Sequence, residues 1–271
     1  MTLLQEKLFA LFGNPIGHSL SPPMHQVAYG EMGLPARYEA YRVENAEEIV
    51  RMIRSLGLQG ASVTLPFKEA ILKYLDEVTE NARTIGAVNT IVNRGGRLIG
   101  ENTDWIGLVR DLVDHVQIRG NTFAVLGAGG MARAAVFGIL HEGGKPVIFN
   151  RTREKGEALA RAFNCQVLPL AALDGFRADG LIQTTPVGMA PETQKSPLKR
   201  ESLANFRYVM DAIYNPLMTK LLRDAEEMGC IPISGVGLFI HQGAEQIRIW
   251  TGLEPPVARM RQAVLDTLMK E

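Results

Sequence analysis

Short apolar runs alternate with segments of helical spacing through the first hundred residues. Strand-like runs cover residues 8–12, 36–43 and 60–65, whereas apolar residues at helical spacing cover 24–32, 47–56 and 69–75. The first two helical segments are each followed by a glycine, and the third strand is followed by Pro66. Glycine and proline at such points are typical of element ends. The alternation predicts α/β units around a largely parallel sheet.

A second series of elements begins near residue 100. A connecting helix is expected at 104–116, and a buried strand at 122–126 runs directly into a glycine-rich turn and a helix at 131–141. Further strands are expected at 146–149, 180–184 and 208–212, and an amphipathic helix at 256–270. A strand, a glycine-rich turn, a helix and a second strand within about 30 residues are typical of a nucleotide-binding fold. The pattern predicts a Rossmann-type unit in the second half of the chain.

The composition limits the classes of partner. Lysine plus arginine equals aspartate plus glutamate at 29 each in 271 residues, so the chain lacks the positive excess of a nucleic-acid-binding protein. No run of about 18 apolar residues predicts a membrane span, and residues 1–10 are too mixed in polarity for a signal peptide. Two cysteines without CxxC spacing, Cys165 and Cys230, are typical of a reducing compartment. We therefore expect a cytoplasmic protein with no membrane or nucleic-acid partner.

The glycine-rich turn matches the GxGxxA form of the dinucleotide fingerprint, with Gly127, Gly129 and Ala132. The first glycine permits a tight turn, the second lets the backbone approach a pyrophosphate, and the small third residue lets helix and strand pack closely. The helix N-terminus then offers backbone N–H groups to the phosphates. A purely structural turn is the alternative, but the position between a clear strand and a clear helix favours a nucleotide site.

The end of the next strand indicates which nucleotide binds. An NAD enzyme usually has Asp or Glu about 20 residues after the glycines, where it holds the ribose 2′-hydroxyl. Here the segment reads Asn150-Arg151-Thr152-Arg153, with Lys155 just after it. Guanidinium groups bind phosphate through paired donors, so this segment suits the 2′-phosphate of NADP. A solvated basic turn is the alternative interpretation.

Polar clusters follow the apolar runs of the N-terminal half, at the positions where α/β sheets bind ligands. The clusters contain Ser19 and Ser21, then Thr64 and Lys68, then Asn89, and finally Asn102 and Asp104. The serines could hold a carboxylate, the Asn, Asp and Thr side chains could hold ring hydroxyls, and Lys68 could exchange a proton with an alcohol or ketone oxygen. Each residue also has an ordinary structural interpretation, such as a turn, a surface lysine or a helix N-cap at Asp104. Their joint occurrence beside a nucleotide-binding unit favours a site for a polyhydroxylated acid.

Linked motifs run in order through both halves of the chain. The N-terminal half contains GNPIxHSLSPxxH from Gly13, VTxPxKE from Val63, GAVNT from Gly86 and NTDxxG from Asn102. The C-terminal half contains GAGG from Gly127, NRT from Asn150, TPxGM from Thr185, YNPxxT from Tyr214 and GxGxxxxQ from Gly235. Together they resemble the NADP-dependent shikimate dehydrogenase family from about residue 8 to about residue 255. Several linked motifs in order are far more specific than any single motif.

The resemblance implies roles for the residues at matching positions. Lys68 would be the catalytic acid/base, coupled to Asp104. The substrate carboxylate would bind Ser19 and Ser21, and the ring hydroxyls would bind Thr64, Asn89, Asp104 and Gln242, with Tyr214 nearby. The pyrophosphate would meet Gly127, Ala128, Gly129, Gly130 and Met131, and the 2′-phosphate would meet Asn150, Arg151, Thr152, Arg153 and Lys155. Backbone atoms of Ala212 and Gly235 would approach the nicotinamide.

The resemblance also implies an α/β fold of two domains with a cleft between them, whose closure would exclude water. The substrate domain would comprise residues 1–104, completed by 238–271, and the NADP-binding Rossmann domain would comprise residues 105–237. The implied reaction is the reversible, NADPH-dependent reduction of 3-dehydroshikimate to shikimate, a step toward chorismate and the aromatic amino acids. The expected partner is the small-molecule substrate, no metal is expected, and the protein would be a monomer or homodimer.

Three departures from the family pattern stand out. Ser62 occupies a position where the family usually has Asn, Gln183 and Thr184 replace the usual Asn-Ala, and Met131 replaces a small residue after Gly130. Ser62 could alter the support of the active-site strand. Met131 could leave less room for the pyrophosphate.

Three alternative functions remain open at this point. A quinate/shikimate dehydrogenase with relaxed substrate and cofactor choice is the nearest, although Arg151 argues against NAD preference and the serine pair favours shikimate. A non-catalytic nucleotide-sensing regulator would tolerate loss of Lys68, which this chain retains together with Asp104. A methylene-folate-type dehydrogenase also has a catalytic lysine and a Rossmann domain, but it gives no reason for the serine pair or the Asn-Thr-Asp cluster.

Overall fold

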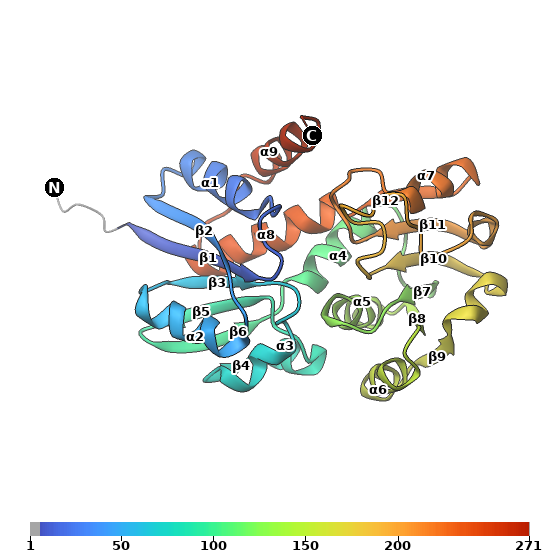
Figure 1. Cartoon of the computed structure of the whole chain (residues 1–271), viewed down its shortest axis with the longest axis horizontal. Helices are drawn as coiled ribbons and strands as arrows, with labels where there is room; N and C mark the ends of the chain where they lie inside the picture. The colour runs from blue at the N-terminus through green and yellow to red at the C-terminus, as the bar shows by residue number, and fades with distance from the viewer. Residues whose placement is uncertain (1–5, 271) are drawn as a thin grey trace. The chain divides into compact units, whose positions relative to one another are not determined.

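The computed structural model describes residues 6–270, whose helices and strands form two compact units. Unit 1 comprises Met1–Thr103 and Ile240–Glu271, and unit 2 comprises Asp104–Phe239. Each unit is an α/β assembly around its own sheet (Figure 1). The domain boundaries implied by the resemblance stay a prediction. The expectation that a signal peptide is absent rests partly on residues 1–5, which lie outside the described residues.

Unit 1 is built around a six-stranded mixed sheet with the order β2-β1-β3-β5-β6-β4. β1 is parallel to β2 and β3, β5 is antiparallel to β3 and β6, and β4 is parallel to β6. The strands are β1 (Lys7–Gly13), β2 (Ala36–Arg42), β3 (Gly60–Val63), β4 (Glu77–Val78), β5 (Thr90–Arg94) and β6 (Arg97–Glu101). The helices are α1 (Ser21–Glu31), α2 (Ala46–Ser55), the 3-10 helix η1 (Ala70–Tyr74), α3 (Glu80–Ile85), α9 (Val257–Leu268) and most of α8 (Val236–Thr251).

The two faces of β3 meet different parts of the chain, because successive strand residues point to opposite faces. Ala61 and Val63 belong to the buried cluster that α2 covers. On the other face, a Cβ atom on Gly60 would overlap the indole ring of Trp250 in α8, so only glycine fits beneath that ring. Ser62 shares this face, which places its hydroxyl toward α8.

Unit 2 contains a six-stranded, fully parallel sheet with the order β12-β11-β10-β7-β8-β9. The chain runs from β7 out to β9 and then crosses to β10 on the other side of β7, so the strand order reverses between β7 and β10. Such a reversal is where open α/β sheets bind ligands, beyond the carboxyl ends of the strands. The strands are β7 (Thr122–Leu126), β8 (Lys145–Asn150), β9 (Gln166–Pro169), β10 (Ala178–Gln183), β11 (Phe206–Asp211) and β12 (Ile231–Ser234).

Helices cover both faces of this parallel sheet. Phe123 and Val125 of β7 pack in a buried cluster with α4 (Asp104–Val113), α5 (Gly130–His141) and α6 (Arg153–Phe163). Ala124 and Leu126 pack in a second cluster with α7 (Lys220–Glu227) and the 3-10 helices η2 (Leu170–Gly175) and η3 (Arg200–Asn205). Burial on both faces explains why β7 is apolar along its length rather than alternating.

Two predicted details of unit 1 are wrong, the pairing of its sheet and the start of its first helix. Its sheet is mixed, because Gly95 and Gly96, both at positive φ, form the turn of an antiparallel β5–β6 hairpin that was not predicted. The helical segment predicted at 69–75 is present, as a 3-10 helix at residues 70–74. α1 begins at Ser21, because Pro22 and Pro23 fit a first helical turn, where backbone N–H groups have no intrahelical partner.

The fold class is confirmed: both units are α/β, and unit 2 has the Rossmann-type parallel sheet. Its predicted strands are present within a residue or two of their expected bounds, whereas β9, β12, α6 and α7 were not predicted. The predicted connecting helix ends at Val113, a few residues early. The described helices include none with the length and apolarity that crossing a bilayer requires.

Candidate functional site

The ends of β1 and β3 hold Thr64 against the Gly13 backbone in unit 1. A Cβ atom on Gly13 would overlap Cγ2 of Thr64, so a larger residue would displace the threonine. The Asn14 N–H donates to the Leu65 carbonyl at 2.9 Å, which ties the two loops together. Gly13 at the end of β1 therefore fixes the position of Thr64, which is predicted to bind the substrate.

Asn89 and Gln242 meet in the buried part of unit 1. Asn89 Nδ2 donates to Gln242 Oε1 at 3.4 Å and to Thr103 Oγ1 at 2.9 Å. The Thr103 N–H donates to Asn89 Oδ1 at 2.7 Å. Asn89 and Gln242 are 2% and 9% exposed, so their amides depend on these partners rather than on bulk water. Two amides with defined donor and acceptor atoms suit recognition of hydroxyl groups.

Lys68 lies next to this pair along the backbone. Its carbonyl accepts from the Val88 N–H at 2.8 Å, and Val88 directly precedes Asn89. The lysine side chain is half-buried, unlike the exposed residues Leu65 and Glu69 around it. The structure thus brings the predicted acid/base residue beside a predicted hydroxyl ligand.

The predicted carboxylate-binding serines share one turn at the start of α1. The Ser21 N–H donates to Ser19 Oγ at 3.2 Å, and the Ser21 carbonyl accepts from His25 Nδ1 at 2.9 Å. Burial lowers the pKa of His25 to about 4, so the ring is neutral near pH 7 and carries its proton on Nδ1. His25 stacks on Tyr38 with ring centroids 4.0 Å apart. This packing anchors the serine turn to the sheet.

The first glycine of the nucleotide motif is required by geometry within unit 2. Gly127 has a φ of +119°, and a Cβ atom there would lie 2.6 Å from Thr184 Oγ1. Thr184 follows β10 and donates its hydroxyl to the Leu126 carbonyl at 2.5 Å. The loops after β7 and β10 therefore meet at the point where the strand order reverses, which is the ligand site of open α/β sheets.

The second glycine leaves space for a ligand. Gly129 is exposed, and a Cβ atom on it would meet no protein atom within 4 Å. It is the N-cap of α5, and no side chain caps that helix end. The N-terminus of α5 thus offers backbone N–H groups to an anion, which fits the pyrophosphate of a dinucleotide. Ala132 is fully buried, as expected for the small third residue.

The basic segment after β8 lies on the surface. Asn150 Nδ2 donates to the Thr152 carbonyl at 2.7 Å and shapes the turn. Arg153 Nε donates to Glu157 Oε1 at 2.7 Å, so this guanidinium already has an acidic partner. Arg151 and Lys155 are exposed and, among the described residues, have no acidic partner. Arg151 is therefore better placed than Arg153 to bind a phosphate.

Ala212 and Gly235, the predicted nicotinamide contacts, lie against each other. A Cβ atom on Gly235 would lie 2.6 Å from the Ala212 carbonyl, so glycine is needed for this approach. The preceding Asp211 is fully buried and accepts from the Ile213 N–H at 3.0 Å and the Thr219 hydroxyl at 2.8 Å. Burial raises the pKa of Asp211 to about 7, against the effect of these two donors.

The structure divides the predicted site residues between the units. Ser19, Ser21, Thr64, Lys68, Asn89 and Gln242 belong to unit 1. Asp104, the first residue of α4, and Tyr214, which stacks on Phe239 with centroids 4.1 Å apart, belong to unit 2 with the predicted cofactor residues. The role of each residue stays a prediction.

Two of the sequence departures have a structural explanation. Gln183 donates through Nε2 to the carbonyls of Thr185 and Val187, both at 3.1 Å, and thereby holds the loop after β10. Ser62 accepts from Tyr38 at 2.6 Å and donates to Gln246 at 2.9 Å. Tyr38 and Gln246 were not predicted as site residues, and no local pattern marks them. The half-buried Met131 packs against the buried cluster of α4 and α5, and its effect on the pyrophosphate stays a prediction.

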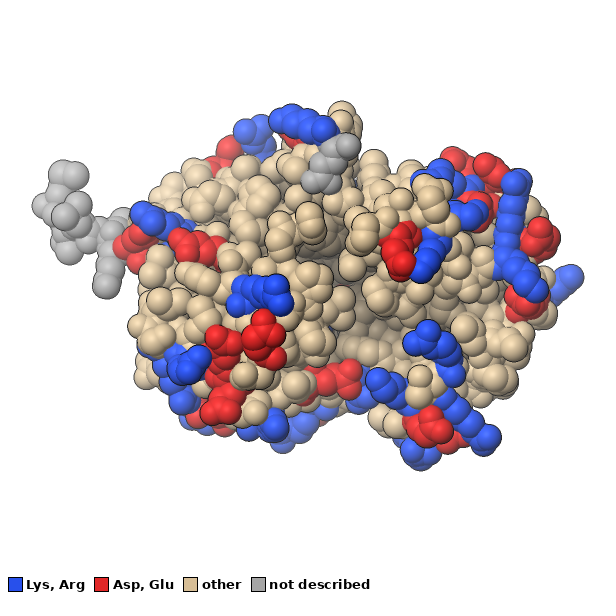
Figure 2. All heavy atoms as spheres, viewed as in Figure 1, with Lys and Arg blue, Asp and Glu red and all other residues tan. Residues whose placement is uncertain are grey.

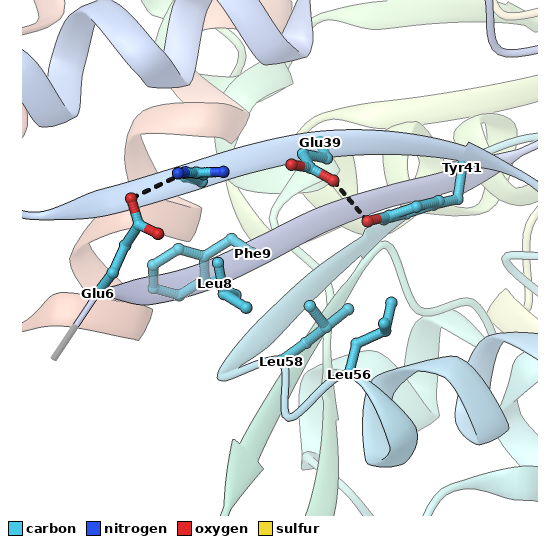
Figure 3. A pocket seen from close by; sticks show the side chains of 8 residues that line it. Glu6, Leu8, Phe9, Glu39, Tyr41, Leu56 and Leu58 are labelled. Atoms are coloured by element: carbon cyan, nitrogen blue, oxygen red, sulfur yellow. Dashed lines mark hydrogen bonds and ion pairs between the residues drawn. The ribbon is translucent and has the colours of Figure 1, made fainter.

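The surface shows a small pocket apart from these residues. It lies over β1 and β2 of unit 1, with Leu8, Phe9 and Leu58 beside the bonded Glu39 and Tyr41 (Figure 3). Lys and Arg are interspersed with Asp and Glu on the face in Figure 2, unlike a nucleic-acid-binding stripe. Within residues 6–270, no group of three His, Cys, Asp or Glu side chains is arranged to hold a metal ion.

Comparisons with known proteins cover nearly the whole chain. Residues 11–91 match the family model of the shikimate dehydrogenase substrate binding domain, and residues 235–265 match that of the shikimate 5'-dehydrogenase C-terminal domain. A shikimate dehydrogenase (NADP(+)) of Bacillus cereus (strain G9842) is 43% identical over 274 residues, covering 97% of this chain and 99% of that protein. One from Geobacillus kaustophilus (strain HTA426) is 42% identical, covering 98% and 100%. The crystal structure of shikimate 5-dehydrogenase from Thermus thermophilus in complex with NADP(H) and shikimate aligns with a TM-score of 0.89 at 36% identity, covering 97% of this chain and 100% of that chain.

Proposed function

Because the chain belongs to the shikimate dehydrogenase family, we propose that it catalyses the reversible, NADPH-dependent reduction of 3-dehydroshikimate to shikimate. This is an oxidoreductase reaction on a CH–OH group, on the route to chorismate and the aromatic amino acids. The observation that carries the proposal is the buried Asn89–Gln242 amide pair beside the Lys68 backbone. It supplies the defined hydrogen-bonding groups that a polyhydroxylated ring requires, next to a group able to move a proton.

Lys68 is the residue that donates the proton in the proposed reaction. When the cofactor is bound, its reduced nicotinamide supplies the hydride to the C3 carbonyl carbon of 3-dehydroshikimate. Lys68 gives a proton from its ammonium group to the oxygen of that carbonyl, which becomes the hydroxyl of shikimate, and Asp104 supports the charge of the lysine. Ser19 and Ser21 bind the substrate carboxylate through their hydroxyls. Ring hydroxyls bind Thr64, Asn89, Asp104 and Gln242, with Tyr214 nearby.

NADP is the cofactor. The exposed Gly129 and the uncapped α5 N-terminus fit its pyrophosphate, together with Gly127, Ala128, Gly130 and Met131. The 2′-phosphate binds the segment that contains Asn150, Arg151, Thr152, Arg153 and Lys155, with Arg151 as the main cation. Backbone atoms of Ala212 and Gly235 would hold the nicotinamide.

The protein acts in the cytoplasm as a monomer or homodimer. Cys165 and Cys230 are both unpaired thiols, which suits a reducing compartment. Burial raises the pKa of each thiol, so neither has the thiolate character of a reactive cysteine. Its partner is the small-molecule substrate.

The deciding experiment follows absorbance of the reduced nicotinamide with shikimate or quinate and with NADP or NAD. Fast reduction of NADP with shikimate, and slow reaction in the other three combinations, is the expected result. Comparable rates with quinate or NAD would favour a quinate/shikimate dehydrogenase of relaxed choice, which no observation on this chain favours at present. No reduction in any combination would remove shikimate as the substrate.

A further inference from the structure

A chain of buried hydrogen bonds joins Gln242 to residues outside the predicted site. It runs through Asn89 and Thr90 to Gln246, and from Gln246 through Ser62 to Tyr38. All of these residues lie in unit 1 and are at most 9% exposed. A polar chain that is buried at every member depends on each bond, because no water replaces a lost partner.

Two backbone groups fix which atoms donate and which accept in this series of hydrogen bonds. The Thr103 N–H only donates, so the Asn89 atom 2.7 Å away is the oxygen Oδ1. The Asn89 carbonyl only accepts, so the Gln246 atom 3.3 Å away is the nitrogen Nε2. A 180° rotation of the Asn89 amide would place its NH2 group against the Thr103 N–H, and the same rotation of Gln246 would place its oxygen against the Asn89 carbonyl.

Every other bond in the chain then has one direction. Gln246 Oε1 accepts from Ser62, whose single proton is thereby used, so Tyr38 must donate to Ser62. Gln246 Nε2 donates to Thr90 Oγ1 at 3.0 Å, and the Thr90 hydroxyl donates to Asn89 Oδ1 at 2.8 Å. Asn89 Nδ2 donates to Gln242 Oε1, so the donating nitrogen of Gln242 points away from Asn89.

We infer that Gln246 is a positioning residue for substrate binding: through Thr90 and Asn89 it holds the Gln242 amide with its nitrogen as the donor toward a ring hydroxyl. Tyr38 and Ser62 fix the Gln246 amide through its oxygen, which accepts from Ser62. The inference rests on the proposed function, because it takes Gln242 as a hydroxyl ligand. Gln246 lies one helical turn after Gln242 on α8, so both side chains share one face of that helix.

The matched control is another side chain that links α8 to β5. Trp250 Nε1 donates to the Ile91 carbonyl at 3.0 Å, one turn beyond Gln246 and outside the chain of bonds. Trp250→Phe removes this bond and lowers stability without changing the direction of any amide. Gln246→Met and Gln246→Glu keep the length of the side chain but remove its N–H donors. Tyr38→Phe is a milder variant that keeps the ring on His25.

The experiment measures shikimate and NADP kinetics and, in the ligand-free protein labelled with ¹⁵N-Asn and ¹⁵N-Gln, the side-chain amide signals of Asn89 and Gln242. We expect both Gln246 variants to raise the KM for shikimate about tenfold, with the KM for NADP unchanged and both amide signals shifted. Tyr38→Phe should do the same to a smaller extent, about twofold. Trp250→Phe should lower the Tm while the KM for shikimate and the amide signals stay as in the wild type.

Amide signals that do not move in any Gln246 or Tyr38 variant would overturn the inference, because the bonds would then not set the amides. A rise in KM of the same size in Trp250→Phe would also overturn it, because a general loosening of α8 would explain the effect. A wild-type chain that does not oxidise shikimate would refute the proposed function instead, and the amide signals would still test the role of Gln246.

Discussion

The proposed sites of the two units rely on different groups, side chains in unit 1 and mainly backbone in unit 2. Unit 1 uses buried side-chain amides and hydroxyls, such as Asn89 and Gln242, whose orientation depends on long-range hydrogen bonds. Unit 2 uses backbone geometry at Gly127 and Gly129, together with exposed cations such as Arg151. A dinucleotide needs a generic phosphate cradle, which glycines and a helix end supply. A small polyhydroxylated ring needs a particular pattern of donors and acceptors, which only oriented side chains supply.

The largest effect expected from this contrast is at Lys68, the proposed acid/base residue of unit 1. Lys68→Ala should reduce kcat by a factor of about 10³, because general acid–base groups contribute roughly 10²–10⁴. The affinity for NADPH, measured by fluorescence titration, should stay within about twofold of the wild type. Lys73→Ala, which removes an exposed cation in η1, is the control and should keep full turnover. Near-normal turnover of Lys68→Ala would remove this residue from the mechanism.

The next effect separates the two glycines of unit 2. Gly127→Ala should destabilise the fold by about 2 kcal/mol, because its φ of +119° strains any other residue and the added carbon meets Thr184. Gly129→Ala should leave the Tm nearly unchanged, because the added Cβ meets no protein atom within 4 Å. It should weaken NADP binding, because the Cβ would intrude on the proposed pyrophosphate site. Thermal unfolding and cofactor titration of both variants test the prediction. Equal losses of stability in both would mean that the loop is a structural turn.

The third prediction asks whether a side chain in unit 2, that of Arg151, sets the preference for NADP over NAD. Arg151→Ala should weaken NADPH by a factor of about 10 to 100, the value of one charge-assisted contact to phosphate, and should hardly affect NADH. Arg161→Ala on the exposed side of α6 is the matched control and should affect neither. The measurement is the dissociation constant of each cofactor. A loss of the same size for NADH would contradict the assignment of the 2′-phosphate site.

The smallest effects concern pH and have opposite signs in the two units. Burial lowers the pKa of His25 from 6.5 to about 4, so between these values the unfolded chain binds more protons and acidification destabilises unit 1. Burial raises the pKa of Asp211 from 3.8 to about 7, so in that range the folded chain binds more protons and unit 2 loses stability as pH rises.

Two variants isolate these contributions. Relative to the wild type, Asp211→Asn should gain about 1–2 kcal/mol of stability between pH 5 and pH 8, because the amide never ionises. Its oxygen still accepts from the Ile213 N–H, and its nitrogen donates to Thr219 Oγ1 in place of the bond that the carboxylate accepts. His25→Phe should gain a similar amount, relative to the wild type, between pH 7 and pH 5. Tm values across this pH range test both. Parallel curves for wild type and variant would show that the residue does not titrate in the folded chain as described.

The same contrast explains what could be predicted from the sequence. The nucleotide loop was accessible because Gly127, Gly129 and the flanking strand and helix are neighbours in the sequence, and their pattern has one physical meaning. The polar residues of unit 1 were found in short clusters and through the resemblance. Ser62 was noted as a support of the active-site strand, but its partner Gln246 was not found, because the two residues are 184 apart in the sequence and nothing local links them. The β5–β6 hairpin was missed although Gly95-Gly96 is a typical two-residue turn.

The path of the chain also sets an order of events during synthesis. Unit 2 is one continuous stretch, so all of its strands have been made before residues 240–271 emerge from the ribosome. Unit 1 must wait for them, because Trp250 stacks on Phe9 with centroids 5.0 Å apart and fills the space above Gly60. Until then the part of the sheet that α8 covers stays open while a later-made unit folds, although Tyr29 of α1 already packs against Phe9 on the same face. This open part is the surface that a chaperone would meet on the nascent chain.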